Sequence, residues 1–357
     1  MNLIPHSKPC MDDKEKKALL KVLQSNQIAQ GPTVNEFEEK FAHFFGMDRG
    51  VSTSSGTSAL HLALLALGIK EKDEIIIPSY VCTSLLNAVH YVRAVPKIVD
   101  IDPHHFNIDP ASVRKNLTYK TKAVIVVHLF GFPADMNPLL KLRFPIIEDC
   151  AQATGARYDG KLTGTIGNLS IFSFYATKMM TTGEGGMILA KSRELIKKIR
   201  DIRDYDCKKD YKLRFNYKIT DLQAAMGIVQ LEKLPGFIRR RMEIKNRYDQ
   251  AFSQWGLTGG LTDPKHKPVY YRYILLLKKG LQRFEKQLQA QGIICCKPIE
   301  KPLHRYLNLN PKNYPGTEEV FKNAVSIPFY PALTSAEVEK IATAVNNAIR
   351  NNRCFSV

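Results

Sequence analysis

The segment SSGTSALHLALLALGIKEKDEIIIPSYVCTSLLNAVHYV (residues 54–92) decides the fold class. Its middle, DEIIIP at 73–78, is a short apolar run rich in isoleucine, which is typical of a strand buried on both faces. SALHLALLALG at 58–68 and TSLLNAVHYV at 83–92 are longer and predict helices on either side of that strand. A buried strand between two helices indicates an α/β domain with a mainly parallel sheet.

The same alternation continues to about residue 190. Short apolar runs predict further buried strands at 123–127, 144–149, 170–174 and 186–190, and a helix near 109–117. After residue 190 the chain becomes highly charged, and its apolar residues follow a helical pattern. The sheet is therefore expected to be complete by that point.

A Pro-Gly pair at 235–236 lies inside a long helical pattern at 233–252. Proline lacks an amide hydrogen and clashes with the preceding turn, so the pair predicts a break in the helix. We expect two domains, a large cofactor-binding domain over 1–235 and a smaller C-terminal α/β domain over 236–357. The second part contains a predicted strand at 269–277, a helix at 281–291 and a final helix from Ser335 to about residue 351.

The composition is that of an ordinary globular protein. Hydrophobic residues make up 44% and charged residues 24% of 357, which excludes collagen-like, low-complexity and largely disordered chains. Lys and Arg exceed Asp and Glu by 52 − 34 = 18, which suits nucleic acid, anionic lipid or anionic small molecules as partners. The seven cysteines form no Cys-x-x-Cys, no signal-peptide pattern opens the chain, and no apolar run would span a bilayer. A cytoplasmic protein is expected.

The predicted helix at 58–68 begins with residue types that suit a phosphate group. Gly56, Thr57 and Ser58 are small, and the first N–H groups of a helix are free to bind an anion. An ordinary helix capped by serine or threonine is the alternative interpretation.

Two further candidates follow along the chain. Asp149 ends the predicted strand in PIIEDCAQ (145–152), where open α/β sheets place ligands, although an internal salt bridge or helix cap is as good an explanation.

Lys178, in FSFYATKMMTTGEGG (172–186), follows another buried strand and can form a Schiff base, whereas a surface lysine is the alternative. A phosphate site, a buried carboxylate and a lysine match the three groups by which a protein binds pyridoxal phosphate, namely its phosphate, its pyridine nitrogen and its aldehyde carbon.

These motifs resemble those of the DegT/StrS family of sugar aminotransferases, and the resemblance covers nearly the whole chain. Besides the segments already quoted, it rests on QGPTVNEFEEKFAHFFG (30–46), EDCAQATGARYDGK (148–161), FNYKITDLQAAMGIVQLEKL (215–234), KPLHRY (301–306) and SIPFYPALTSAEVEKI (326–341). The resemblance implies the aspartate-aminotransferase type of α/β fold, pyridoxal phosphate as cofactor, no metal, and a homodimer.

The resemblance also implies a role for individual residues. Lys178 matches the lysine that carries pyridoxal phosphate, and Asp149 matches the carboxylate that pairs with the pyridinium nitrogen. His304, in KPLH, matches a histidine on the substrate side. The other implied cofactor contacts are Gln152 beside the ring, Gly56, Thr57, Ser58 and Ser173 at the phosphate, and Asn216, which reaches the phosphate bound in the neighbouring subunit.

Two positions depart from the family pattern. Cys82 stands where many members carry an aromatic residue stacked on the cofactor ring, so that stacking is weaker or is supplied by Tyr80. Lys218 stands where arginine is common, which puts bidentate recognition of an anion there in doubt.

The resemblance implies an aminotransferase that moves an amino group from an amino acid, with glutamate expected, to a nucleotide-linked keto-deoxyhexose. The partners would be small molecules and a second copy of the chain, with neither nucleic acid nor a membrane. A family dehydratase, a cyclitol aminotransferase and a non-catalytic basic protein that regulates or binds nucleic acid are the alternatives. Lys178 argues against the dehydratase, in which histidine replaces the lysine, and no nucleic-acid-binding motif supports the last alternative.

Overall fold

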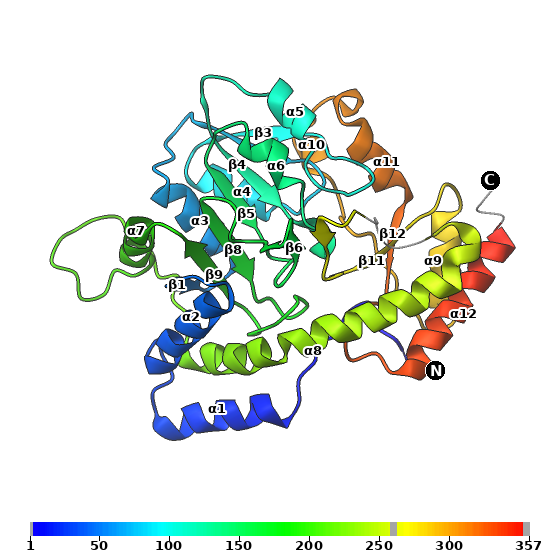
Figure 1. Ribbon diagram of the computed structural model, residues 1–357, viewed down its shortest axis with the longest axis horizontal. Coiled ribbons are helices and arrows are strands. Elements are labelled where there is room, and N and C mark those ends of the chain that lie inside the picture. The colour runs from blue at the N-terminus through cyan, green and yellow to red at the C-terminus, as the bar shows by residue number, and fades with distance from the viewer. Residues whose placement is uncertain (1–2, 258–262, 353–357) are drawn as a thin grey trace.

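The computed structural model describes residues 3–257 and 263–352, and Figure 1 shows their arrangement. A seven-stranded sheet with the order β1-β9-β8-β5-β4-β2-β3 forms the centre of the larger part. β9 runs antiparallel to both of its neighbours, and the other adjacent pairs are parallel. The predicted α/β fold with a mainly parallel sheet is confirmed. The strands are β1 (Gly50–Thr53), β2 (Glu74–Pro78), β3 (Val95–Val99), β4 (Thr121–Val127), β5 (Ile146–Asp149), β8 (Leu169–Ser173) and β9 (Gly186–Ala190).

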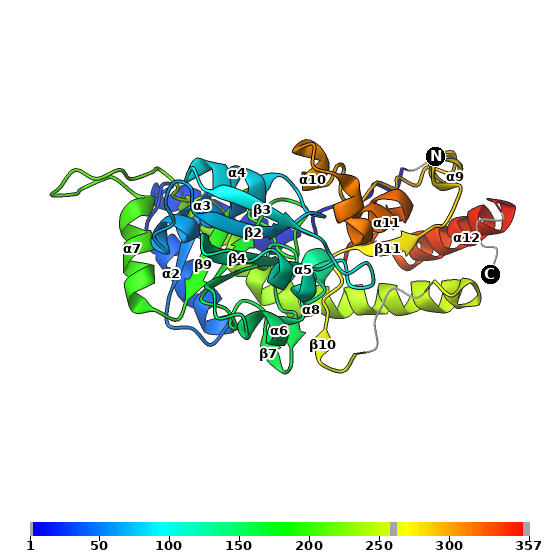
Figure 2. The same cartoon turned by 90° about the horizontal axis from the view of Figure 1, so that it is seen from above.

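Helices cover both faces of this sheet, as Figures 1 and 2 show. Successive side chains of β2 point to opposite faces, so Ile75 and Ile77 pack in one apolar cluster and Ile76 packs in another. Both clusters are buried, which explains why the strand is apolar throughout rather than alternating. The covering helices are α2 (Pro32–Phe44), α3 (Gly56–Ala66), α4 (Ser84–Tyr91), α5 (Pro110–Lys115), α6 (Met136–Leu140) and α7 (Arg193–Arg203), and α1 (Asp13–Ser25) packs outside them against α8 (Asp221–Phe252).

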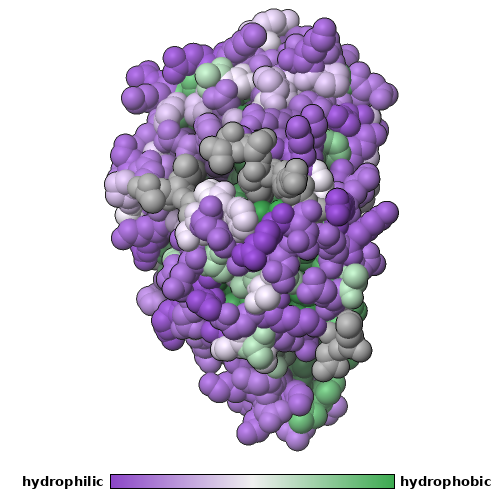
Figure 3. All heavy atoms as spheres, turned by 90° about the vertical axis from the view of Figure 1, so that its right-hand side faces the viewer, coloured by the Kyte–Doolittle hydropathy of each residue, from purple (hydrophilic) through white to green (hydrophobic). Residues whose placement is uncertain are grey.

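A second apolar core lies at the other end of the molecule. Here β11 (Tyr273–Leu276) pairs antiparallel with β12 (Ala324–Ile327), within the predicted strand at 269–277. Ile4 is buried in the same core, so the N-terminal segment packs with C-terminal residues. Figure 3 shows this end of the molecule, whose surface is largely hydrophilic. The helices α9 (Leu281–Gln289) and α12 (Ser335–Asn352) bury side chains in this core. The helices α10 (Leu303–Tyr306) and α11 (Pro315–Asn323) instead bury Leu303 and Val320 in the core of the large sheet.

The predicted helix break at the Pro-Gly pair is wrong. α8 is one helix of 32 residues with Pro235 inside it. Its start is fixed by a capping box between Thr220 and Gln223. Leu234 on one side of the break position is buried in the core of the large sheet, and Tyr248 on the other side is buried in the second core. This packing holds the helix together across the proline. The division of the chain into domains at residue 236 therefore stays a prediction.

The remaining elements are short. β6, β7 and β10 form a small three-stranded antiparallel sheet. Within the described residues, no helix combines the length and the apolar character that crossing a membrane requires. The short elements are β6 (Arg157–Tyr158), β7 (Lys161–Leu162), β10 (His266–Lys267) and the 3-10 turns Leu129–Gly131, Ser253–Trp255 and Pro311–Asn313.

Candidate active site

The carboxyl ends of the parallel strands meet at one edge of the sheet, and several predicted cofactor residues lie there. Asp149 is the last residue of β5, and Ser173 is the last residue of the adjacent β8. Lys178 lies in the turn that joins β8 to β9. The start of α3 follows β1, which is the other neighbour of β9. Open α/β sheets bind ligands at this edge, so the topology gathers the candidates where a ligand site is expected.

The start of α3 has two free N–H groups. Ser55 caps the helix, and its Oγ accepts the N–H of Ser58 at 3.0 Å. The Ser58 hydroxyl lies 2.8 Å from that of Ser55. Of the predicted phosphate contacts, Ser58 is thus engaged in the cap, whereas the N–H groups of Gly56 and Thr57 donate to no described residue. These two remain available to an anion.

Gly56 allows the helix start to meet Ser173. A Cβ atom at position 56 would lie 2.9 Å from Cβ of Ser173 and 3.3 Å from its Oγ, closer than real side chains approach. A glycine is therefore required for the two phosphate candidates on β8 and α3 to lie side by side.

Asp149 is buried, with 4% of its surface exposed. Its Oδ1 accepts the N–H of Ala151 at 3.0 Å, and no described cation lies within ion-pair distance of it. Burial raises the pKa of Asp149, and the Ala151 N–H and the charges of Lys178 and His128 oppose that rise. The alternative of an internal salt bridge is thus not found among the described residues. A buried carboxylate of this kind needs a cation to be stable as an anion.

Lys178 is held by a loop with two glycine turns. Its N–H donates to the carbonyl of Tyr175 at 2.9 Å, and Gly183 and Gly185 have φ angles of 81° and 156°, which other residues rarely adopt. The Lys178 ammonium lies 5.3 Å from the ring centre of Tyr271. It forms no ion pair with any carboxylate in the described parts of the chain.

Gln152 lies after β5 and holds the loop that follows β4. Its Oε1 accepts the N–H of Phe130 at 2.7 Å, and Phe130 has a left-handed φ of 56°. The cofactor-ring role of Gln152 stays a prediction. So does the stacking role of Tyr80, whose buried ring meets that of Phe130 edge to face at 6.3 Å, while Cys82 is exposed.

Asn216 is exposed, and its side chain makes no hydrogen bond within the described chain. The carbonyl of the next residue, Tyr217, accepts the N–H of Ser54 at 2.8 Å, so the FNYK segment lies beside the start of α3. Lys218 forms ion pairs with Asp204, at 2.9 Å, and with Asp206. Lys218 is therefore neutralised by its own chain rather than free to hold an anion.

His304 is held by its own chain, and its predicted place on the substrate side stays a prediction. Its side chain is fully buried, with Nδ1 2.6 Å from the Ser79 hydroxyl and Nε2 2.8 Å from Glu318. Its ring also stacks on Tyr314 at 4.4 Å. Burial lowers the pKa of His304, and the hydrogen bond and charge of Glu318 oppose that shift. With both ring nitrogens occupied, this histidine is placed to position Ser79 at the end of β2.

Comparison with known proteins identifies the relatives of this chain. The sequence profile of the DegT/DnrJ/EryC1/StrS aminotransferase family matches residues 9–346. The chain belongs to this family. The prediction from the sequence is thereby confirmed, and so is pyridoxal phosphate as the cofactor of the family, since one solved relative is described in its PLP form.

Several relatives of this aminotransferase match over almost their full length. GDP-perosamine synthase of Caulobacter vibrioides is 33% identical over 362 residues, which cover 96% of this chain and 97% of the relative. The spore coat polysaccharide biosynthesis protein SpsC of Bacillus subtilis is 32% identical, with 98% of each chain covered. Among solved structures, the aminotransferase TlmJ from Streptoalloteichus hindustanus superposes with a TM-score of 0.93 at 28% identity, over 98% of this chain and 100% of TlmJ. The aspartate-aminotransferase type of fold is confirmed.

The residues of this aminotransferase fit pyridoxal phosphate. The buried carboxylate of Asp149 lacks a cation, which a pyridinium nitrogen would supply. The free N–H groups of Gly56 and Thr57 belong to a helix start that lies against Ser173, which suits a phosphate. Lys178 lies on the loop that follows Ser173. These residues would hold the cofactor, and each role stays a prediction.

Sequence reasoning missed three side chains close to Lys178. Tyr271 is buried and its hydroxyl lies 3.2 Å from that of Thr177. The guanidinium carbons of Arg241 and Arg272 lie 6.0 and 5.5 Å from the centre of its ring. The segment YYRY (270–273) contains an arginine among aromatic residues, which is unusual for a buried strand. That irregularity was the available signal.

One buried cluster has the residue types of a metal site but is already satisfied. The carboxylate of Glu148 accepts the N–H groups of Gly164, Ile166 and Gly167 and faces His128 at 3.0 Å. The other nitrogen of His128 accepts the N–H of Ala134. The cluster, which also includes Cys150, therefore has its polar atoms occupied by the protein itself.

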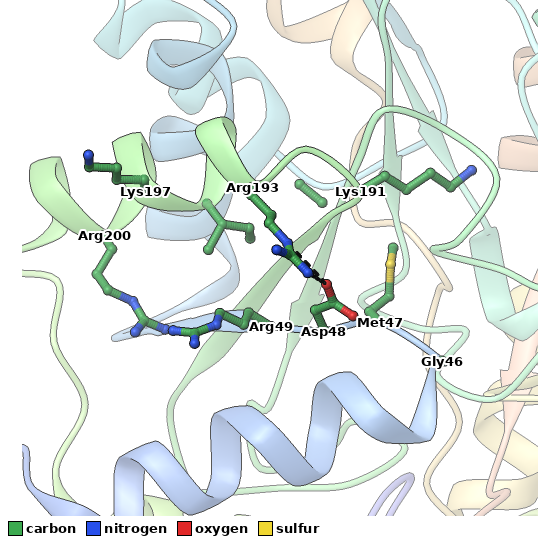
Figure 4. Close-up of a pocket in the computed structure, with 10 residues that line it drawn as sticks. Gly46, Met47, Asp48, Arg49, Lys191, Arg193, Lys197 and Arg200 are labelled. Carbon is green, nitrogen blue, oxygen red and sulfur yellow. Dashed lines mark hydrogen bonds and ion pairs between the residues drawn. The ribbon is translucent and has the colours of Figure 1, made fainter.

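A further cavity lies away from this site. It is a hollow of about 800 Å³ between the loop before β1 and α7, shown in Figure 4. β1 begins beside this hollow and ends at the start of α3, so the hollow lies at the opposite end of the strand from the phosphate candidates. Its only carboxylate among the described lining residues, Asp48, is paired with Arg193 at 2.8 Å. The hollow therefore lies outside the predicted cofactor site.

Proposed function

We propose that this aminotransferase moves an amino group from glutamate to the ketone of a nucleotide-linked keto-deoxyhexose. The observation that supports it most is the gathering of Asp149, Lys178 and the α3 start at the carboxyl edge of the sheet. Relatives that are named GDP-perosamine synthase and a spore coat polysaccharide biosynthesis protein support a sugar acceptor. The net charge of +18 suits two anionic substrates.

The roles of the side chains follow from their positions. When bound, pyridoxal phosphate supplies an aldehyde carbon that carries the amino group and a ring that accepts electrons. Lys178 would hold this cofactor, and its Nζ would act as the base that moves a proton to and from the α-carbon of the donor. Asp149 keeps a proton on the ring nitrogen, since burial without another cation makes that pairing strong. The N–H groups of Gly56 and Thr57 orient the phosphate.

A panel of ketones tests the acceptor. The purified protein, loaded with pyridoxal phosphate, is incubated with glutamate and with keto-deoxyhexoses linked to guanosine, uridine or thymidine diphosphate, and with a cyclitol ketone. We expect one nucleotide-linked sugar to gain an amino group, seen by mass, with one 2-oxoglutarate formed for each. Amination of the cyclitol alone would reject the sugar acceptor. Lys178→Ala protein serves as the inactive control.

We infer further that the active site is shared between two copies of the chain. The supports are the family resemblance of the FNYK segment and the exposed side chain of Asn216, which has no partner within the described chain. A two-fold dimer is the commonest closed assembly and gives two identical shared sites. In that dimer, Asn216 would contact the phosphate held by the other copy.

Mixed dimers test the shared site. Each parent, Lys178→Ala or Asn216→Glu, is expected to be nearly inactive, the first without its lysine and the second with a carboxylate facing a phosphate. In the mixed dimer one site carries both changes and the other carries neither, so the mixed dimer, separated after co-expression, should have about half of the activity of the wild-type dimer. Mixed dimers confirmed by mass but without activity would show that Asn216 serves its own chain.

A further inference from the structure

Three positively charged side chains lie around the buried ring of Tyr271, and one of them, Arg241, is itself buried. The Nζ of Lys178 and the guanidinium carbons of Arg272 and Arg241 lie 5.3, 5.5 and 6.0 Å from the centre of its ring. Within the described ranges, none of these three cations has a carboxylate within ion-pair distance. Cations lie favourably over an aromatic face, but a ring quadrupole does not neutralise three charges.

The two arginines are fixed by neutral groups. Nη1 of Arg241 donates to the carbonyls of Tyr271 and Phe329 at 3.0 and 3.1 Å, while its buried Nε has no partner among the described residues. Nη1 of Arg272 donates to the Cys296 thiol at 3.2 Å, a weak acceptor. The acceptors of Arg241 and Arg272 therefore carry no negative charge that would neutralise the two guanidinium groups.

The phenol of Tyr271 is the group whose negative form would offset this positive charge. Its Oη lies 3.2 Å from the Oγ1 of Thr177, the residue before Lys178. Burial raises the pKa of Tyr271, but the charges of Lys178 and Arg272, the Thr177 hydroxyl and Arg241 together lower it below the ordinary value. The adjacent Tyr270 has the opposite shift, since burial raises its pKa.

The charged and titratable groups that face Tyr271 come from several segments of the chain. Lys178 and Thr177 face it from the loop after β8, Arg241 faces it from α8, and Arg272 follows it in the chain. Beyond the arginines lies the N-terminal segment. His6 there is neutral, because burial and then the charge of Arg272 lower its pKa to about 4. Burial raises the pKa of the Cys10 thiol.

We propose that Tyr271 positions Lys178 and accepts the proton that the lysine must lose before its amine can react. The phenolate oxygen of Tyr271 takes one proton from the ammonium, directly or through the Thr177 hydroxyl, and leaves a phenol and a neutral amine. The transfer moves one proton and no electrons, and it needs no further reactant. The aromatic ring beneath the ammonium keeps the lysine chain in place. The inference rests on the proposed function, because it assumes that Lys178 is the reactive lysine.

Tyr271→Phe separates the two roles, since it keeps the ring and removes only the hydroxyl. Tyr270→Phe is the matched control, because it removes a neighbouring hydroxyl that is not next to Thr177. The first measurement is an ultraviolet pH titration of phenolate in the cofactor-free proteins. We expect one tyrosine to ionise below the ordinary pKa of about 10 in the wild type and in Tyr270→Phe, but not in Tyr271→Phe.

The second measurement is the rate at which added pyridoxal phosphate becomes fixed to the protein, followed by its visible absorbance at several pH values. We expect Tyr271→Phe to be slower by roughly 10²-fold, the lower end of what a positioned base contributes, and the rise of its rate to move to higher pH, because Lys178 must then lose its proton to solvent. An unchanged rate or an unchanged phenolate titration in Tyr271→Phe overturns the inference. Failure of wild-type protein to fix any cofactor would instead reject the proposed function, and the phenolate titration would still decide the inference.

Discussion

Lys178→Ala is expected to abolish amino transfer and the covalent fixation of pyridoxal phosphate. The variant loses both the covalent anchor and the base, and a positioned base alone contributes roughly 10²–10⁴-fold in rate. Since Lys178 forms no ion pair within the described chain, its removal should leave the fold intact. The measurements are turnover with glutamate and the visible absorbance of protein after borohydride treatment and dialysis.

Lys191→Ala provides the matched control for that experiment. Lys191 is an exposed lysine at the end of β9, beside the hollow of Figure 4, and lies outside the catalytic site. This variant should keep its turnover and its bound cofactor. Wild-type turnover in Lys178→Ala would show that another residue carries the cofactor and would overturn the site as a whole.

Asp149→Asn is expected to slow the half-reaction with glutamate by roughly 10²–10⁴-fold. The substitution keeps an oxygen for the Ala151 N–H but removes the charge that would pair with a buried cation. Breaking a buried pair costs about 3–5 kcal/mol, which corresponds to that range of rates. Cofactor should still be fixed through Lys178, so rapid mixing of loaded protein with glutamate isolates the effect.

Asp48→Asn is a suitable comparison, because Asp48 forms only an exposed pair with Arg193. Its half-reaction should match that of the wild type. An unchanged half-reaction in Asp149→Asn would mean that this carboxylate is structural and that the ring nitrogen is held otherwise.

The fold and the centre of the site could be predicted from local patterns. The strands β2 and β5 are apolar because both of their faces are covered, and that pattern is visible in the sequence. Asp149 stood out because it ends a buried strand, where open α/β sheets place ligands, and Lys178 because it lies between a buried strand and a glycine-rich turn. Their placement at one edge then followed from the parallel sheet.

Other features depend on contacts between distant segments and could not be predicted. The partners of His304 come from residues 79 and 318, so its burial is invisible in KPLH alone. Pro235 was expected to break a helix, but packing of α8 on two cores overrides that local preference. The charge around Tyr271 likewise arises from three separate segments of the chain.

The continuous α8 has a consequence for how this protein unfolds. At 1.5 Å per residue, a helix of 32 residues is about 48 Å long, and it supplies buried side chains to both cores. Unfolding of the first part of α8 removes apolar contacts from the core of the large sheet, and unfolding of its last part removes them from the second core. We therefore expect the two cores to unfold together, and a cut at residue 236 to remove a helix that both cores use.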